Sequence, residues 1–140
     1  MVNKAQIKDS LTVTGKRKTA IAKATLKPGT GKIKINNKNY ENLQKFHKLT
    51  IKEPLDIYQS VIGALKSDIN VNVKGGGQES QIEAARLAIA KVLFKSTNSQ
   101  ELRQAFLNYD KNMLVADVRR KEPNKPGDSK ARSMRQSSKR

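Results

Sequence analysis

Cysteine and tryptophan are absent from this sequence, and histidine occurs once, at His47. Without cysteine the chain forms neither a disulfide nor a thiolate metal site, which fits a reducing compartment. The single imidazole lies among lysines in KFHKL, so we expect a surface or interface group rather than a base or a metal ligand. The few acids do not recur in a catalytic pattern. We therefore expect no catalytic residues, no metal and no cofactor.

Long apolar runs are also missing. No stretch approaches the roughly 18 residues that a membrane-spanning helix needs. The opening MVNKAQIKDS lacks the apolar segment of a signal peptide. We expect a soluble protein that stays in the cytoplasm and is not inserted in a membrane.

Negative charge is scarce as well: twelve acidic residues face 29 lysines and arginines, a formal net charge of +17. Such a chain attracts polyanions, so its partner is nucleic acid, an anionic membrane surface or an acidic protein. The sequence contains only three Phe and three Tyr. Because unpaired bases are usually held by exposed aromatic rings, binding to nucleic acid should go mainly to phosphate and ribose.

Apolar residues divide the chain into two parts. Every Leu, Ile, Val and Phe lies within residues 1–118, which are long enough for one folded body. Residues 119–140 carry nine Lys or Arg against two acids, and Pro123 and Pro126 disfavour helix near their start. We predict a globular domain, 1–118, followed by an extended basic tail, 119–140. Fully stretched, that tail spans roughly 70 Å.

Hydrophobic periodicity predicts an α+β fold, a four-stranded and mostly antiparallel sheet with helices on one face. Period-two alternation marks strands at 11–15, 19–27, 32–36 and 68–75, with a hairpin loop at Gly29 to Gly31 between the second and third. Helical spacing predicts a helix that begins at Pro54 and two further helices over 78–95 and 99–110, the last capped by Ser99 and using Leu102, Phe106 and Tyr109 as its inner face.

The stretch VKGGGQESQ places Gly75, Gly76 and Gly77 between a strand and a helix. Backbone N–H groups at such a turn can hold a phosphate at the positive end of the helix. The alternative is that the glycines only permit a sharp turn and close packing. Gln78 and Glu79 follow where a nucleotide-binding P-loop needs Lys and Ser or Thr, and contiguous glycines do not match a dinucleotide fingerprint.

The stretch TGKRKTA concentrates Lys16, Arg17 and Lys18 between two strands. A run of charge is often only a solvated surface. Here Lys23, Lys27, Lys32 and Lys34 extend the positive surface across the same sheet, a pattern typical of binding to a phosphate backbone. Asp110 and Asp117 are expected to support neighbouring arginines.

Three separated stretches resemble one known family. TGKRKTAIAKATLKPGTGKIKIN, VKGGGQESQIEAARLAIAKVL and YDKNMLVADVRRKEPNKPG, followed by a basic end, are similar to the small-ribosomal-subunit protein nine family, and the third looks like its archaeal and eukaryotic branch. The resemblance implies the fold of the second domain of small-subunit protein five, with a left-handed βαβ crossover. It also implies a non-enzymatic constituent of the small ribosomal subunit, located on the cytoplasmic ribosome.

The same resemblance implies specific partners. The body would bind ribosomal RNA of the subunit head and lie beside other head proteins, without forming a homo-oligomer. The tail would reach the transfer RNA in the peptidyl site through Lys139 and Arg140. The ribosomal RNA contacts would come from Lys16, Arg17, Lys18, Lys32, Lys34, Gly75, Gly76, Gly77, Arg119, Arg120, Lys121, Lys125, Lys130, Arg132 and Arg135.

Two other functions are compatible with parts of this sequence. A nucleotide-dependent enzyme with a glycine-rich loop would need a catalytic acid-and-lysine pattern that is missing here. A general DNA-binding protein would bind duplex DNA and ribosomal RNA with similar affinity, whereas a ribosomal protein should prefer structured RNA at raised salt.

Overall fold

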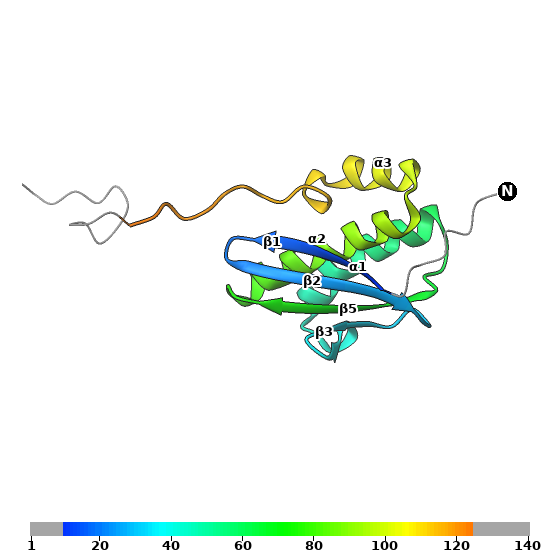
Figure 1. Ribbon diagram of the computed structural model, residues 1–140, viewed down its shortest axis with the longest axis horizontal. Coiled ribbons are helices and arrows are strands. Elements are labelled where there is room, and N and C mark those ends of the chain that lie inside the picture. The colour runs from blue at the N-terminus through cyan, green and yellow to red at the C-terminus, as the bar shows by residue number, and fades with distance from the viewer. Residues whose placement is uncertain (1–9, 125–140) are drawn as a thin grey trace, which may run out of the picture.

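The computed structural model describes residues 10–124 of the chain (Figure 1). One mixed, mostly antiparallel sheet runs in the order β1-β2-β5-β3-β4. Its strands are β1 (Leu11–Arg17), β2 (Ala20–Pro28), β3 (Ile33–Ile35), β4 (Lys38–Asn39) and β5 (Ser67–Lys74). The helices are α1 (Lys45–Val61), α2 (Gln78–Thr97) and α3 (Gln100–Tyr109), with short 3₁₀ turns η1 (Tyr40–Asn42) and η2 (Lys111–Met113). The predicted α+β class is confirmed.

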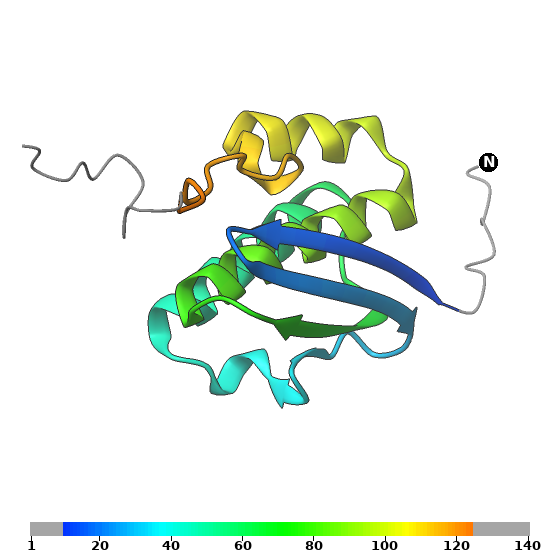
Figure 2. The same ribbon diagram turned by 60° about the vertical axis from the view of Figure 1, so that its left-hand side comes forward.

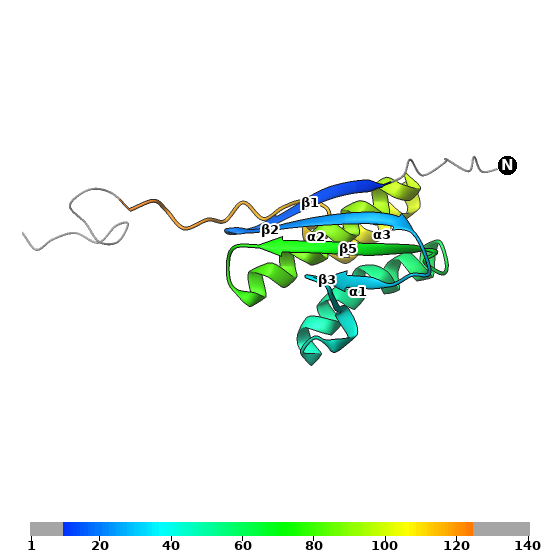
Figure 3. The same ribbon diagram turned by 60° about the horizontal axis from the view of Figure 1, so that its bottom comes forward.

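The predicted alternation along β2 is confirmed, because Ala20, Ala22, Ala24 and Leu26 are all buried under the helices. Small side chains on this face let α2 approach the sheet closely. One close approach is at Gly15 in β1, where a Cβ atom would collide with the Ala84 carbonyl oxygen of α2. The opposite face of the sheet is not covered by any helix of residues 10–124 and is exposed to solvent (Figures 1 and 3).

The predicted helices over 78–95 and 99–110 and the predicted cap at Ser99 are confirmed, whereas Asn98 was not predicted as the end of α2. The left-handed Asn98, with φ of 50°, ends α2, and the Ser99 hydroxyl accepts a hydrogen bond from the Leu102 N–H at the start of α3. Leu102 and Phe106 are buried as expected. Tyr109 is not, because its side chain is 58% exposed on the last turn of α3.

The predicted hairpin between the second and third strands is wrong, since β5 lies between β2 and β3. Instead β3 pairs parallel with β5, and α1 forms the crossover between them. The sheet also has a fifth strand, because Asn36 and Asn37 both take positive φ and turn the chain into the two-residue β4. The left-handed sense of the crossover stays a prediction of the family resemblance.

The predicted start of the first helix is also wrong, because α1 begins at Lys45 and encloses Pro54. An internal proline costs about 3 kcal/mol of helix stability. Burying Ile51 and Tyr58 on the same face contributes about 1.5–3 kcal/mol each, which offsets that cost. His47 was expected to be a surface or interface group, and the surface alternative is wrong. The residue is only 7% exposed, and its Nε2 lies 2.7 Å from Glu79 Oε1 at the start of α2.

After η2 the chain leaves the body in an extended segment that passes the β1–β2 turn (Figure 2). Within residues 10–124, no helix is long and apolar enough to cross a membrane. The division into a domain at 1–118 and a tail at 119–140 stays a prediction.

Candidate nucleic-acid interface

The β1–β2 turn brings three predicted binding residues to one end of the sheet. Arg17 pairs with Ala20 at the last position of the antiparallel ladder, so Lys18 and Thr19 alone form the turn. Lys18 has a positive φ of 51°, which reverses the chain abruptly. Lys16 and Lys18 are exposed, whereas Arg17 is turned toward the protein.

Two of the three glycines, Gly75 and Gly76, lie against this turn. Gly75 and Gly76 have φ of +77° and +68°, a backbone region that favours glycine. A Cβ atom on Gly75 would lie 2.7 Å from the Thr19 carbonyl oxygen, so a side chain would push the loop away from the turn. Gly75 and Gly76 therefore have the structural role considered from the sequence, which is to permit a sharp turn and close packing. Phosphate binding by Gly75, Gly76 and Gly77 stays a prediction.

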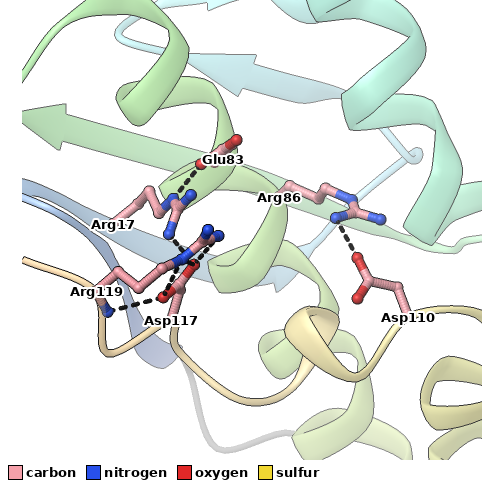
Figure 4. A network of polar contacts seen from close by, with 6 residues as sticks. All are labelled: Arg17, Glu83, Arg86, Asp110, Asp117 and Arg119. Carbon is pink, nitrogen blue, oxygen red and sulfur yellow. Dashed lines mark hydrogen bonds and ion pairs between the residues drawn. The ribbon is translucent and has the colours of Figure 1, made fainter.

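The extended C-terminal segment is fastened to the same end of the sheet (Figure 4). Arg17 forms ion pairs with Glu83 of α2 and with Asp117. Asp117 in turn accepts hydrogen bonds from Arg119, at 2.7 Å from Nη2 and 2.8 Å from the backbone N–H. The Arg120 guanidinium donates to the Lys18 carbonyl oxygen over 3.2 Å. These contacts confirm the predicted support of an arginine by Asp117.

These contacts keep the carboxylate of Asp117 ionised. Hydrogen bonds from the side chain and the backbone N–H of Arg119, together with the one from Arg17, hold the pKa of Asp117 well below its ordinary value. The hydrogen bond to Glu83 and that to Asp117 raise the pKa of Arg17. The side chains of Arg17 and Asp117 are only 17% and 12% exposed. The Arg17 side chain therefore makes ion pairs within the fold and is mostly shielded from solvent.

A second arginine ties the helices together. Arg86 of α2 lies 2.7 Å from Glu53 of α1 and 2.8 Å from Asp110 after α3, which confirms the expected role of Asp110. The Arg86–Asp110 pair lies beside the first network in Figure 4. Both networks fix where the extended segment leaves the body.

A shallow pocket of about 660 Å³ opens where the turn and the segment meet. We call its cationic residues the hairpin-end cluster: Lys18, Arg119, Arg120 and Lys121. No acidic side chain lines the pocket among the residues that the structure describes. Lys16 lines an adjoining pocket of about 210 Å³ that contains the Arg17 network.

Lys32 and Lys34, the other predicted residues of the body, lie away from this cluster. Lys34 is exposed on β3, on the open face of the sheet, and Lys32 follows the loop that joins β2 to β3. The exposed face also holds Lys74, Asn70 and Asn72 of β5, which were not among the predicted binding residues. Their alternation with Ile69, Val71 and Val73 was visible, but the pairing that brings them beside β2 was not.

The remaining predicted residues lie outside the described part of the chain. They are Lys125, Lys130, Arg132, Arg135, Lys139 and Arg140. Within residues 10–124, no group of three or more His, Cys, Asp or Glu side chains is arranged to hold a metal ion. The described surface offers cations and hydrogen-bonding groups that can hold a polyanion.

Comparison with known proteins agrees with the resemblance seen in the sequence. The family described as Ribosomal protein S9/S16 matches residues 15–140. Small ribosomal subunit protein uS9 of Methanococcus vannielii is 46% identical over 116 residues, which cover 82% of this chain and 85% of that protein. The protein of the same name from Methanococcus maripaludis strain C5 is 44% identical over the same shares of both chains.

Proposed function

Because the chain belongs to the ribosomal protein S9/S16 family and is a non-enzymatic structural constituent of the small ribosomal subunit, we propose that its body binds ribosomal RNA of the subunit head and that its tail reaches the transfer RNA in the peptidyl site. Its partners are then ribosomal RNA, that transfer RNA and neighbouring head proteins. It acts as one copy per subunit rather than as a homo-oligomer.

One observation carries the proposal: the hairpin-end cluster lies where the basic tail begins. Arg120 and Lys121 continue the positive surface of Lys18 directly into residues 122–140, which are themselves rich in Lys and Arg. A polyanion bound at the cluster would therefore be continuous with one bound along the tail. The salt bridges of Asp117 give that path a fixed starting point on the body.

The predicted residues then take distinct roles. Lys16, Lys18, Lys32 and Lys34 neutralise phosphates from the body, and Gly75 to Gly77 let the backbone approach a phosphate closely. Arg17 and Arg119 chiefly hold the segment in place, because both guanidinium groups contact Asp117. The tail residues Lys125, Lys130, Arg132 and Arg135 follow the RNA, and Lys139 and Arg140 hold the transfer RNA backbone.

General DNA binding is the rival function to be tested. We expect the full chain to prefer small-subunit ribosomal RNA over duplex DNA, and the preference to grow as salt suppresses nonspecific contacts. Replacing Lys18, Arg120 and Lys121 by alanine should lower the slope of log affinity against log salt by about 3. Equal affinity for the two nucleic acids at every salt concentration would contradict the proposal.

The tail assignment has its own test. Small subunits reconstituted with a chain that lacks Lys139 and Arg140 should assemble normally but hold peptidyl-site transfer RNA less tightly. A chain with Lys45→Ala and Lys52→Ala, which removes two exposed charges from α1, is the matched control. Unchanged transfer RNA retention after truncation would contradict the assigned role of the tail end.

A further inference from the structure

The uncovered side of the sheet carries an ordered array of side chains, which we call the open face. It combines alternate residues of four strands that the ladder registers place in rows. The first row contains Lys16, Ile21 and Lys74, and the second contains Thr14, Lys23 and Asn72. The third row contains Thr12, Thr25, Asn70 and Lys34. Lys27 and Asp68 end the array. All these side chains project from the same side because residues two apart on a strand share a face.

The charge of the open face suits a polyanion. It holds five lysines: Lys16, Lys23, Lys27, Lys34 and Lys74. Asp68 is its one acid within residues 10–124, and this carboxylate already accepts hydrogen bonds from the backbone. Its Oδ1 accepts hydrogen bonds of 2.8 Å from the backbone N–H groups of Thr30 and Lys32. Asp68 therefore lies toward the β2–β3 loop at one end of the array and leaves the lysines uncompensated.

The uncharged polar members of the open face have hydrogen-bonding capacity left for a partner. Thr12 and Thr25 hydrogen-bond each other over 3.1 Å. The side chains of Asn70 and Asn72 make no hydrogen bond to any described residue, although each amide can both donate and accept. Asn72 lines a pocket of about 480 Å³ together with Lys23 and Lys74. A ribose 2′-hydroxyl is likewise both donor and acceptor, so it matches these groups.

Within residues 10–124, the open face has no aromatic side chain on which an unpaired base could stack. The aromatic side chains of the chain are Tyr40, Phe46, Tyr58, Phe94, Phe106 and Tyr109, and all of them belong to helices. Ile21, 43% exposed, is the large apolar group of the face and offers a surface for a sugar ring rather than for a stacked base. The chemistry therefore points to backbone and ribose.

The width of the array does not fit the minor groove of B-form DNA. Neighbouring strands lie about 4.8 Å apart, so a row across β1, β2 and β5 spans about 10 Å. That row is wider than the minor groove of B-form DNA, about 6 Å. An RNA duplex instead has a wide, shallow minor groove lined by 2′-hydroxyls.

We propose that the open face binds the minor-groove side of a ribosomal RNA duplex. Asn70, Asn72 and Thr25 hydrogen-bond ribose 2′-hydroxyls, and Lys23, Lys34 and Lys74 contact the flanking phosphates. This inference rests on the proposed RNA-binding function and deepens it by naming paired RNA and the hydroxyls as what the sheet recognises.

The test uses the full chain and three probes: an RNA duplex, a DNA duplex of the same sequence, and one RNA strand alone. Asn70→Ala with Asn72→Ala should weaken RNA-duplex binding roughly tenfold or more, as expected for two lost hydrogen bonds, and leave DNA binding and the salt slope unchanged. Thr12→Val with Thr25→Val, which keeps shape and strand propensity, should act in the same direction. Melting of each variant confirms that it is folded.

Two further variants distinguish the hydrogen bonds of the asparagines from the charge of the lysines. Gln104→Ala with Asn108→Ala removes two exposed amides from α3 and should change nothing. Lys23→Ala, Lys34→Ala and Lys74→Ala together should weaken RNA and DNA binding alike and lower the salt slope by about 3.

Loss of RNA and DNA binding in equal measure in the asparagine variant, no loss at all, or tighter binding of the single strand than of the duplex would overturn the inference. If the unaltered chain also failed to bind small-subunit RNA in preference to DNA, the proposed function itself would fail.

Discussion

Arg86 of α2 links three helical segments, because its guanidinium contacts carboxylates from α1 and from the residue after α3. Replacing it by alanine leaves Glu53 and Asp110 partly buried without their cation. Breaking a fully buried pair costs 3–5 kcal/mol, and an exposed pair 0–1 kcal/mol. At 16% exposure of Arg86 we expect Arg86→Ala to lower the free energy of unfolding by about 2 kcal/mol.

Denaturant unfolding of purified protein measures this effect. Arg103→Ala, which removes an exposed arginine from α3, is the control and should stay within about 0.5 kcal/mol of the unaltered chain. Similar losses in both variants would show that the Arg86 ion pairs add nothing.

Gly15 is required by packing alone. A Cβ atom there would meet the Ala84 carbonyl oxygen and would come 2.7 Å from the Ala88 backbone nitrogen, so α2 would have to move. Overpacking of this kind costs about 1–3 kcal/mol. Gly77→Ala is the comparison variant: Gly77 has φ of −94° and nothing within 4 Å of its Cβ position, so the added methyl group meets no clash and only the N-cap preference of α2 is affected. Thermal melting should show a larger decrease for Gly15→Ala than for Gly77→Ala; the reverse order would contradict this packing.

At the scale of elements, the β2–β3 loop depends on the Asp68 carboxylate. Backbone hydrogen bonds, first from Lys32 and also from Thr30, lower the pKa of Asp68 below its ordinary value. A carboxyl group whose pKa is lower in the folded state contributes stability above its unfolded pKa of about 3.9 and loses it as pH falls further.

Asp68→Asn should therefore melt at a lower temperature than the unaltered chain at pH 7, and the difference should shrink as pH falls below about 4. Asp56→Asn, on the exposed surface of α1, should show no such difference at either pH. A melting difference for Asp68→Asn that grows on acidification would contradict the assigned role.

The sequence predicted elements well where one local pattern decides them. Alternation along 19–27 and 68–75 marked the strands, and Ser99 marked the start of α3, because burial and capping are set within a few residues. Pro54 misled the prediction because tertiary burial of α1 outweighs the local cost of an internal proline. The insertion of β5 between β2 and β3 depends on contacts between distant residues, which no local pattern records.

In the candidate nucleic-acid interface, too, local patterns were predictable and contacts between distant residues were not. Lys16 to Lys18 and Arg119 to Lys121 were recognisable as cations from sequence, but their meeting at one pocket follows from the fold. Composition alone could not distinguish Arg17 from its exposed neighbours, because its ion pairs with Glu83 and Asp117 form only in the folded structure.

At the scale of the whole molecule, we propose that the folded body and the cationic C-terminal segment perform different tasks. Within the described residues, the salt bridges at Asp117 and the helix contacts of Arg86 fix where the segment departs. Residues 119–140 are then long enough to reach roughly 70 Å when fully extended. A body of this size can thus contact RNA at a distance much greater than its own radius.

Sedimentation of the tagged full chain in a cell extract tests this account most directly. We predict that the chain migrates with small ribosomal subunits, that ribonuclease treatment releases it, and that replacing Lys18, Arg120 and Lys121 by alanine weakens the association in moderate salt. Recovery of the unaltered chain chiefly as a free monomer, with or without ribonuclease, would contradict the account.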